Sequence, residues 1–109
     1  MARATWQDAV LAKGNDVVVV EGNCYFRRED VHWEYLKPST HTTICGWKGT
    51  ANYYDVEVDG KRNENAAWYY AAPKPAAAEI QNRIAFWKGV SVKSLPTAQT
   101  AEIGQQCAI

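Results

Sequence analysis

The chain carries no excess of charge of either sign. Twelve basic and twelve acidic side chains give a formal net charge of zero over 109 residues. A protein without a broad basic surface is a poor general binder of nucleic acid, and any site for an anion has to be local. We therefore expect no nucleic-acid partner.

Long apolar runs and closely spaced pairs of cysteines are also missing. No stretch has the length of a membrane span, and the first residues lack the apolar segment of a signal peptide. The three cysteines, Cys24, Cys45 and Cys107, cannot all pair within the chain and contain no C-x-x-C motif. These absences predict a cytoplasmic protein in a reducing compartment, with no membrane partner.

Leucine is scarce, since it occurs only at positions 11, 36 and 95. The core must therefore use valine, alanine, tryptophan and tyrosine, a mixture that favours strands. The five Trp and six Tyr combine a flat apolar body with a polar group, which is typical of half-buried cores, pockets and interfaces. We predict a mainly β fold, a small single-domain curled sheet or barrel with one or two short helices. The domain covers residues 1–96, and residues 97–109 form a loosely ordered tail with few apolar anchors.

Periodicity places the elements of this domain. Residues 1–13 favour a short helix, with a strand as the alternative, and residues 28–36 favour a second short helix that ends before Pro38. Four valines at 17–20 predict a central strand buried on both faces. The remaining predictions are an alternating strand at 54–58, a hairpin at Asp59-Gly60 with a loop longer than two residues, strands at 66–72, 84–87 and 90–92, and a helical turn at 76–83.

The stretch 39–54, S-T-H-T-T-I-C-G-W-K-G-T-A-N-Y-Y, has the densest chemistry in the chain. It lacks the apolar alternation of a core strand, yet its aromatic residues do not suit a flexible linker. We predict a structured loop that feeds a strand. If the sheet curls, this loop closes one mouth of it and a pocket forms there.

Lys48 is the first candidate for chemistry in this stretch. It stands between Trp47 and Gly49, where an aromatic wall and bare backbone could hold its ammonium against a small substrate. Desolvation would lower its pKa toward acid–base use. The alternative is a lysine whose stem covers Trp47 while its charged end stays in water.

Other residues complete this candidate site. Trp68 and Tyr70 share one face of the predicted strand, and Tyr69 points to the other face. The hypothesis assigns catalytic roles to Lys48 and Tyr53. Its substrate-binding residues are His41, Thr42, Thr43, Trp47, Trp68 and Tyr70. The alternative is that the aromatic side chains are only a well-packed core.

Cysteine and metal chemistry are the competing interpretations. Cys45 could be a nucleophile with His41 as its base and Lys48 lowering its pKa, but a buried structural cysteine is the interpretation that we favour, because the two side chains would face the same way only in a helix. His32, His41, Cys24 and Cys45 have no partner at metal-ligand spacing. We assign no metal site and no cofactor.

Five motifs in order give the chain a resemblance to a known family. They cover roughly residues 16–90 and are similar to those of the domain of unknown function 427 family, which usually has Pro where this chain has Gly46. The motifs are Tyr25-Phe26-x-x-Glu-Asp-Val, Pro38-Ser39, Cys45-x-Trp-Lys-Gly-x-Ala-x-Tyr-Tyr, Asn65-Ala-Ala-Trp-Tyr-Tyr-x-x-Pro and Ile84-Ala-Phe-Trp. The resemblance implies a small β-rich fold, and a nucleotidyltransferase label is sometimes attached to the family.

That label suggests magnesium held by Asp55 and Glu57 after a Gly49-Thr50 phosphate contact. Surface polar positions on an amphipathic strand explain the same two carboxylates without a metal. Three hypotheses therefore stand at this point. In the first, the chain is a cofactor-independent domain that binds a small organic molecule and, if it is an enzyme, is of the isomerase, cyclase or lyase type. In the second, it is a noncatalytic interaction module that binds a protein, or its own copy as a homodimer. In the third, it is a magnesium-dependent nucleotidyltransferase.

Overall fold

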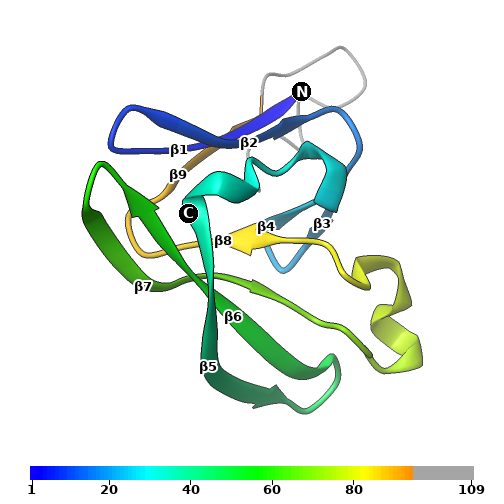
Figure 1. Ribbon diagram of the computed structural model, residues 1–109. Helices are drawn as coiled ribbons and strands as arrows, with labels where there is room; N and C mark the ends of the chain where they lie inside the picture. Colours follow the sequence, from blue (N-terminus) through cyan, green and yellow to red (C-terminus); the bar gives the residue numbers. More distant parts are fainter. Residues whose placement is uncertain (95–109) are drawn as a thin grey trace.

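Three antiparallel sheets make up residues 1–94, the part of the chain that the computed structural model describes (Figure 1). The mainly β single domain that the sequence predicts is confirmed, and the predicted tail at 97–109 lies outside the described residues. Within residues 1–94 the sheets do not close into a barrel, because β5 and β8 remain edges of the largest sheet. The four-stranded sheet contains β5 (Leu36–Cys45), β6 (Gly49–Val58), β7 (Lys61–Tyr69) and β8 (Ala85–Phe86).

The other two sheets are smaller and pack beside the first. The three-stranded sheet has the order β2-β1-β9, and the two-stranded sheet pairs β3 with β4. Figure 1 shows the β1–β2 hairpin at one end of the molecule and the turn between β5 and β6 at the other. Their strands are β1 (Ala2–Trp6), β2 (Ala9–Gly14), β9 (Ser91–Ser94), β3 (Val17–Val20) and β4 (Asn23–Phe26).

The N-terminal residues form strands, so the predicted helix over 1–13 is wrong and its alternative is correct. Ala2 and Ala4 are both fully buried, and this period of two is that of a strand. The reversal at Gln7 and Asp8 uses positive φ angles of 51° and 63° without any glycine. The sequence therefore carried no ordinary turn signal between β1 and β2.

The predicted helix at 28–36 is also wrong. Two single 3-10 turns stand there, η1 (Arg28–Asp30) and η2 (Trp33–Tyr35). Val31 between them bridges to Ala12, and the His32 N–H donates to the Leu11 carbonyl at 2.7 Å. Pairing with β2 thus overrides the local helical pattern. The helical turn predicted at 76–83 is found as η3 (Pro75–Ile80), in 3-10 form.

The stretch 39–54 is not a loop but part of a hairpin formed by the ten-residue strands β5 and β6. Its β5 half is almost entirely exposed, so apolar alternation is not required there. β-branched side chains at Thr40, Thr42, Thr43 and Ile44 nevertheless favour extended backbone. Only residues 46–48 turn the chain.

The remaining strand predictions are confirmed with two corrections. Among the described strands β3 pairs only with β4, and its valines are half-buried, so it is not a strand buried on both faces. The Asp59-Gly60 hairpin has a two-residue turn with φ angles of 50° and 78°, shorter than predicted. Strands also lie in the predicted regions 84–87 and 90–92, as β8 and β9.

The two faces of the four-stranded sheet cover two separate apolar clusters. Tyr54 and Tyr69 pack on the larger cluster, which includes the three-stranded sheet. Tyr53, Trp68 and Tyr70 belong to the smaller cluster on the other face, together with side chains of β3 and β4. The predicted division of Trp68 and Tyr70 from Tyr69 is confirmed, and the smaller cluster lies beneath the candidate site.

Candidate functional site

A pocket of about 250 Å³ opens over the smaller apolar cluster. The turn between β5 and β6, strands β6 and β7, the start of β4 and the residue after β8 all contribute to its wall. Four residues that the sequence analysis selected meet here, and two that it did not select join them. The lining residues are Asn23, Lys48, Tyr53, Trp68, Tyr70 and Trp87.

Aromatic rings make up most of this wall. Tyr53 and Trp68 are register partners on β6 and β7, and the rings of Trp68 and Trp87 meet edge to face with centroids 5.7 Å apart. Beneath them lies Tyr25, which is fully buried and accepts a hydrogen bond from Trp68 Nε1 at 3.2 Å. This bond uses the indole donor, so Trp68 offers the pocket an apolar surface.

Lys48 supplies the charge of the pocket. Only 7% of the residue is exposed, and its ammonium forms an ion pair with Glu21 on the turn between β3 and β4. The same ammonium lies 5.6 Å from the ring centroids of Trp47 and of Tyr70. These contacts hold a buried cation among one carboxylate and two ring faces.

The short turn explains why Lys48 points inward. Gly49 has a φ of 113°, a conformation that favours glycine, and it lets the chain enter β6 directly after the lysine. The Lys48 carbonyl accepts a hydrogen bond from the Lys74 N–H at 2.9 Å, which fixes the turn against the segment after β7. Trp47 stays 41% exposed and donates from Nε1 to Glu21 at 3.3 Å, so it covers the ion pair but does not line the pocket.

The lowered pKa expected for Lys48 is wrong. Burial alone would lower the pKa of this lysine, but the hydrogen bond to Glu21 opposes burial, and the pKa is raised above its ordinary value. The same hydrogen bond lowers the pKa of Glu21. At neutral pH Lys48 is therefore an ammonium that donates hydrogen bonds and does not abstract protons.

Tyr70 and Tyr25 remain neutral phenols. Burial raises the pKa of both hydroxyls, and for Tyr70 this effect outweighs the opposing charge of Lys48. The pocket thus combines one fixed positive charge with neutral donors and aromatic faces. Such a combination can orient a small molecule and stabilise negative charge on it.

The predicted residues on β5 lie outside this pocket. The Thr43 hydroxyl and the Tyr53 hydroxyl are 2.9 Å apart and share a hydrogen bond, and the His41 ring lies 4.8 Å from the Tyr53 ring. His41 and Thr42 line a different, polar depression that also contains Asp55 and Arg62. β5 therefore supports Tyr53 from behind. Of the predicted substrate-binding residues, only Trp68 and Tyr70 line the pocket, and Thr43 and Trp47 line neither surface.

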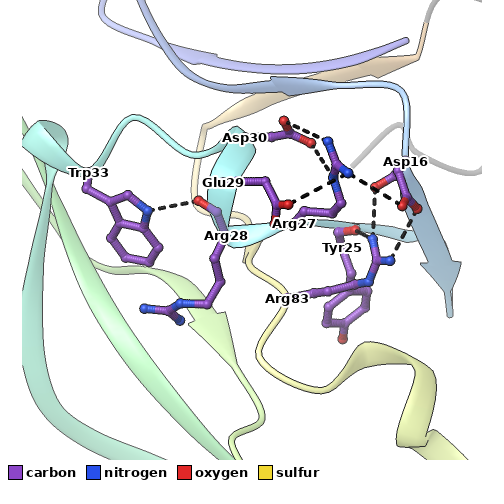
Figure 2. Close-up of polar contacts among 8 residues, drawn as sticks. All are labelled: Asp16, Tyr25, Arg27, Arg28, Glu29, Asp30, Trp33 and Arg83. Carbon is purple, nitrogen blue, oxygen red and sulfur yellow. Dashed lines mark hydrogen bonds and ion pairs between the residues drawn. The ribbon is translucent and has the colours of Figure 1, made fainter.

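An ionic network fixes the strand that carries Tyr25 (Figure 2). Arg83 Nη2 is 3.2 Å from Asp16 Oδ1, and its Nη1 donates to the Tyr25 carbonyl at 3.5 Å. Arg27 Nε donates to Asp30 at 3.0 Å and lies beside Asp16 in the same view. These contacts join β4, η1 and the segment before β8, and so hold the floor of the pocket in position.

Cys45 lies next to the site as a free, half-buried thiol. The backbone N–H groups of Lys48 and Trp47 lower its pKa. Among the residues described, no hydrogen bond joins it to His41, whose contacts are with Ser39 and Tyr53. The alternative of a Cys45 nucleophile with His41 as its base is therefore not supported by these contacts.

Asp55, one of the two carboxylates of the nucleotidyl-transfer hypothesis, has a structural role. Asp55 is only 3% exposed, forms an ion pair with Arg62 and accepts the Asn65 N–H at 2.8 Å. Asn65 stands at an irregularity in β7 with a φ of 56°, so Asp55 satisfies the backbone where the strand bulges. Within residues 1–94 no three His, Cys, Asp or Glu side chains form a group suited to a metal ion.

Glu21, Asn23 and Trp87 are the site residues that the sequence analysis missed. Glu21-Gly22 is a turn with φ angles of 54° and 80°, and its glycine is an ordinary turn signal. Its position against the β5–β6 turn was not visible, because the two are brought together only by packing of the sheets. Long-range convergence of this kind leaves no local pattern.

Comparison with other proteins agrees with the resemblance in the motifs. None of the helices in the described part of the chain is long and apolar enough to cross a membrane. No curated protein matches the chain. The family model named NTP_transf_9, described as a domain of unknown function (DUF427), matches residues 1–96 and so covers every described strand. The chain belongs to the DUF427 family.

Proposed function

We propose that the chain binds a small, flat, partly apolar organic molecule in the pocket beside Lys48. The observation that carries this proposal is a buried ammonium in the wall of an aromatic pocket of about 250 Å³. Ligand pockets typically measure roughly 300–1,000 Å³, so this one suits a molecule with one or two rings. Tyr53, Trp68 and Trp87 would contact its faces and edges.

Catalysis of the isomerase, cyclase or lyase type fits the same groups. Lys48 as an ammonium and Tyr70 as a neutral phenol are donors that would stabilise an oxyanion developing on the substrate. Tyr53 would contribute a further hydroxyl, oriented by its hydrogen bond with Thr43. In this role Lys48 polarises the substrate, and the proton acceptor belongs to the substrate or to solvent.

A fragment screen by ligand-observed NMR tests the proposal, with one- and two-ring aromatic compounds as probes. Lys48→Met keeps the apolar stem of the lysine but removes its charge, and Lys61→Met is the matched control on an exposed lysine. We expect several probes to bind, and Lys48→Met to weaken those with polar substituents about tenfold, because a buried charged hydrogen bond is lost. Lys61→Met should bind as the wild type does.

The proposal fails if no probe binds, or if binding is equal in the wild type, in Lys48→Met and in Trp68→Phe. Folding of each variant is checked first by its urea unfolding midpoint. If Lys48→Met unfolds at a lower urea concentration than the wild type, it is replaced by Lys48→Gln, which retains a polar end.

A second candidate function is association through the β5 edge. Ile44 is 85% exposed and Trp47 is 41% exposed at the same end of this strand, which pairs only with β6 among the described strands. Exposed edges of this kind recruit further strands. Native mass spectrometry of wild type and Ile44→Lys tests this: a homodimer lost in the variant supports association, and a monomer at high concentration contradicts it.

A further inference from the structure

We propose that the ligand of the aromatic pocket carries a carboxylate, and that this carboxylate competes with Glu21 for the Lys48 ammonium. The inference rests on the proposed function and gives that function a chemical class. It also assigns a role to Glu21, a residue that does not line the pocket but sits on the turn beside it. The two members of the ion pair differ in burial, and the proposal follows from that difference.

Lys48 is the buried member of the ion pair, and little of its side chain is accessible to water. Its side chain is 9% exposed, it lines the pocket, and its ammonium is enclosed by Glu21 and the rings of Trp47 and Tyr70. A buried ammonium is stable only with an anionic partner or an equivalent set of acceptors. A molecule that fills this pocket must therefore leave Glu21 in contact with Lys48 or bring an anion of its own.

Glu21 is the member that exchanges easily. Its side chain is 51% exposed, and it stands on a tight turn between β3 and β4. Its carboxylate would be hydrated as soon as it left the ammonium, so the exchange strands no buried charge. Within residues 1–94, the only other side-chain hydrogen bond of Glu21 comes from Nε1 of Trp47, an exposed indole.

The charge and lining of the pocket favour a carboxylate over other groups. Replacing Glu21 by a ligand carboxylate exchanges one negative charge for another and leaves the local charge unchanged. Tyr70 and Asn23 line the pocket with Lys48, and their hydroxyl and amide groups suit the two oxygens of a carboxylate. A phosphate dianion would bring a second charge without a second cation in this wall.

A cationic ligand is the main alternative for an aromatic pocket, since ring faces attract ammonium groups. Lys48 already occupies that role, because its ammonium faces the Tyr70 ring at 5.6 Å. A second cation in the same pocket would be repelled at short range. The aromatic surface is therefore left for the uncharged part of the ligand, and the anionic end faces Lys48.

Isothermal titration with matched acids and amides tests the inference. The probes are benzoate with benzamide, and indole-3-carboxylate with indole-3-carboxamide, which differ mainly in charge. The proteins are the wild type, Glu21→Gln, Lys48→Met and a control, Glu34→Gln, on an exposed glutamate. Urea midpoints are compared first, and Glu21→Ser replaces Glu21→Gln if that variant is poorly folded.

We expect the wild type to prefer each acid over its amide. Glu21→Gln should bind the acids about three- to tenfold more tightly, because removing a half-exposed competitor frees the ammonium, while amide binding changes less than about twofold. Lys48→Met should lose the preference for acids. Glu34→Gln should behave as the wild type does.

The outcomes separate this inference from the proposed function. Equal binding of acids and amides in both wild type and Glu21→Gln, or weaker acid binding in Glu21→Gln, overturns the carboxylate inference and leaves the aromatic pocket intact. Failure of all four probes to bind any of the proteins overturns both.

Discussion

Tyr25 and Trp68 are joined by a hydrogen bond from the indole Nε1 to the phenol oxygen, 3.2 Å long, across 43 positions of the sequence. Their rings also meet edge to face, with centroids 6.2 Å apart. Tyr25 lies on β4 and Trp68 on β7, so this contact joins the two-stranded sheet to the four-stranded one directly beneath the pocket. It is a polar contact inside the smaller cluster of buried residues.

The first prediction concerns that hydrogen bond. Tyr25→Phe keeps the ring but leaves the Trp68 N–H without its acceptor, and a buried donor left unpaired costs about 1–3 kcal/mol. Urea unfolding should show this loss. Tyr35→Phe is the control, because no hydrogen bond of the Tyr35 hydroxyl is seen in residues 1–94, and it should change stability by less than about 0.5 kcal/mol. Equal stability of the two variants would contradict the prediction.

The second prediction compares two glycines of one turn. Gly49 has a φ of 113°, so Gly49→Ala strains the backbone and should cost about 1–3 kcal/mol in the free energy of unfolding. A Cβ at Gly46 would meet nothing within 4 Å, and Gly46→Ala should be neutral within about 0.5 kcal/mol. Thermal and urea unfolding of both variants check this. The prediction is wrong if Gly46→Ala and Gly49→Ala prove equally stable.

Sequence patterns predicted this fold where the signal was local. The alternation at 54–58, the Asp59-Gly60 turn and the scarcity of leucine each report a property of neighbouring residues, and the β class follows from them. The helices predicted at 1–13 and 28–36 failed because alanines paired across strands and Val31 bridged to β2. Those interactions depend on residues distant in the chain.

For the candidate site too, the residues with a local signal were predicted from the sequence and the contact made over a long range was not. Lys48, Tyr53, Trp68 and Tyr70 were found because polar groups among aromatic residues are unusual, and they do line one pocket. The pKa of Lys48 was predicted in the wrong direction, because burial was visible in the pattern whereas Glu21, 27 positions away, was not.

The third prediction concerns Asp55. Burial alone would raise the pKa of this carboxyl, but hydrogen bonds from Arg62 and from the Asn65 N–H outweigh it, and the pKa is lowered below its ordinary 3.8. The stabilisation is present above the unfolded-state pKa and is lost as pH falls below 3.8 toward the lowered folded-state value. Asp55→Asn should cost about 1.5–3 kcal/mol at neutral pH, since it removes charged hydrogen bonds.

Urea unfolding at neutral and acidic pH measures this effect. The difference between wild type and Asp55→Asn should shrink in acid, because protonation removes the charge from Asp55 as the substitution does. Glu57→Gln, on the same strand, serves as the control and should stay within about 0.5 kcal/mol of the wild type at neutral pH. If the difference in unfolding free energy persists at the lowest pH, the charge of Asp55 is not what stabilises the β7 bulge.

The fourth prediction concerns Cys45, whose pKa is lowered from 9.0 mainly by the backbone N–H groups of Lys48 and Trp47. Iodoacetamide labelling, followed at the Cys45 peptide by mass spectrometry, should accelerate with a midpoint below 9.0, because the thiolate is the reactive form. Lys48→Met retains both N–H groups and should keep most of this shift. Gly49→Ala distorts the turn that presents them and should move the midpoint back toward that of N-acetylcysteine labelled in parallel. A wild-type midpoint at or above 9.0 would show that the turn does not stabilise the thiolate.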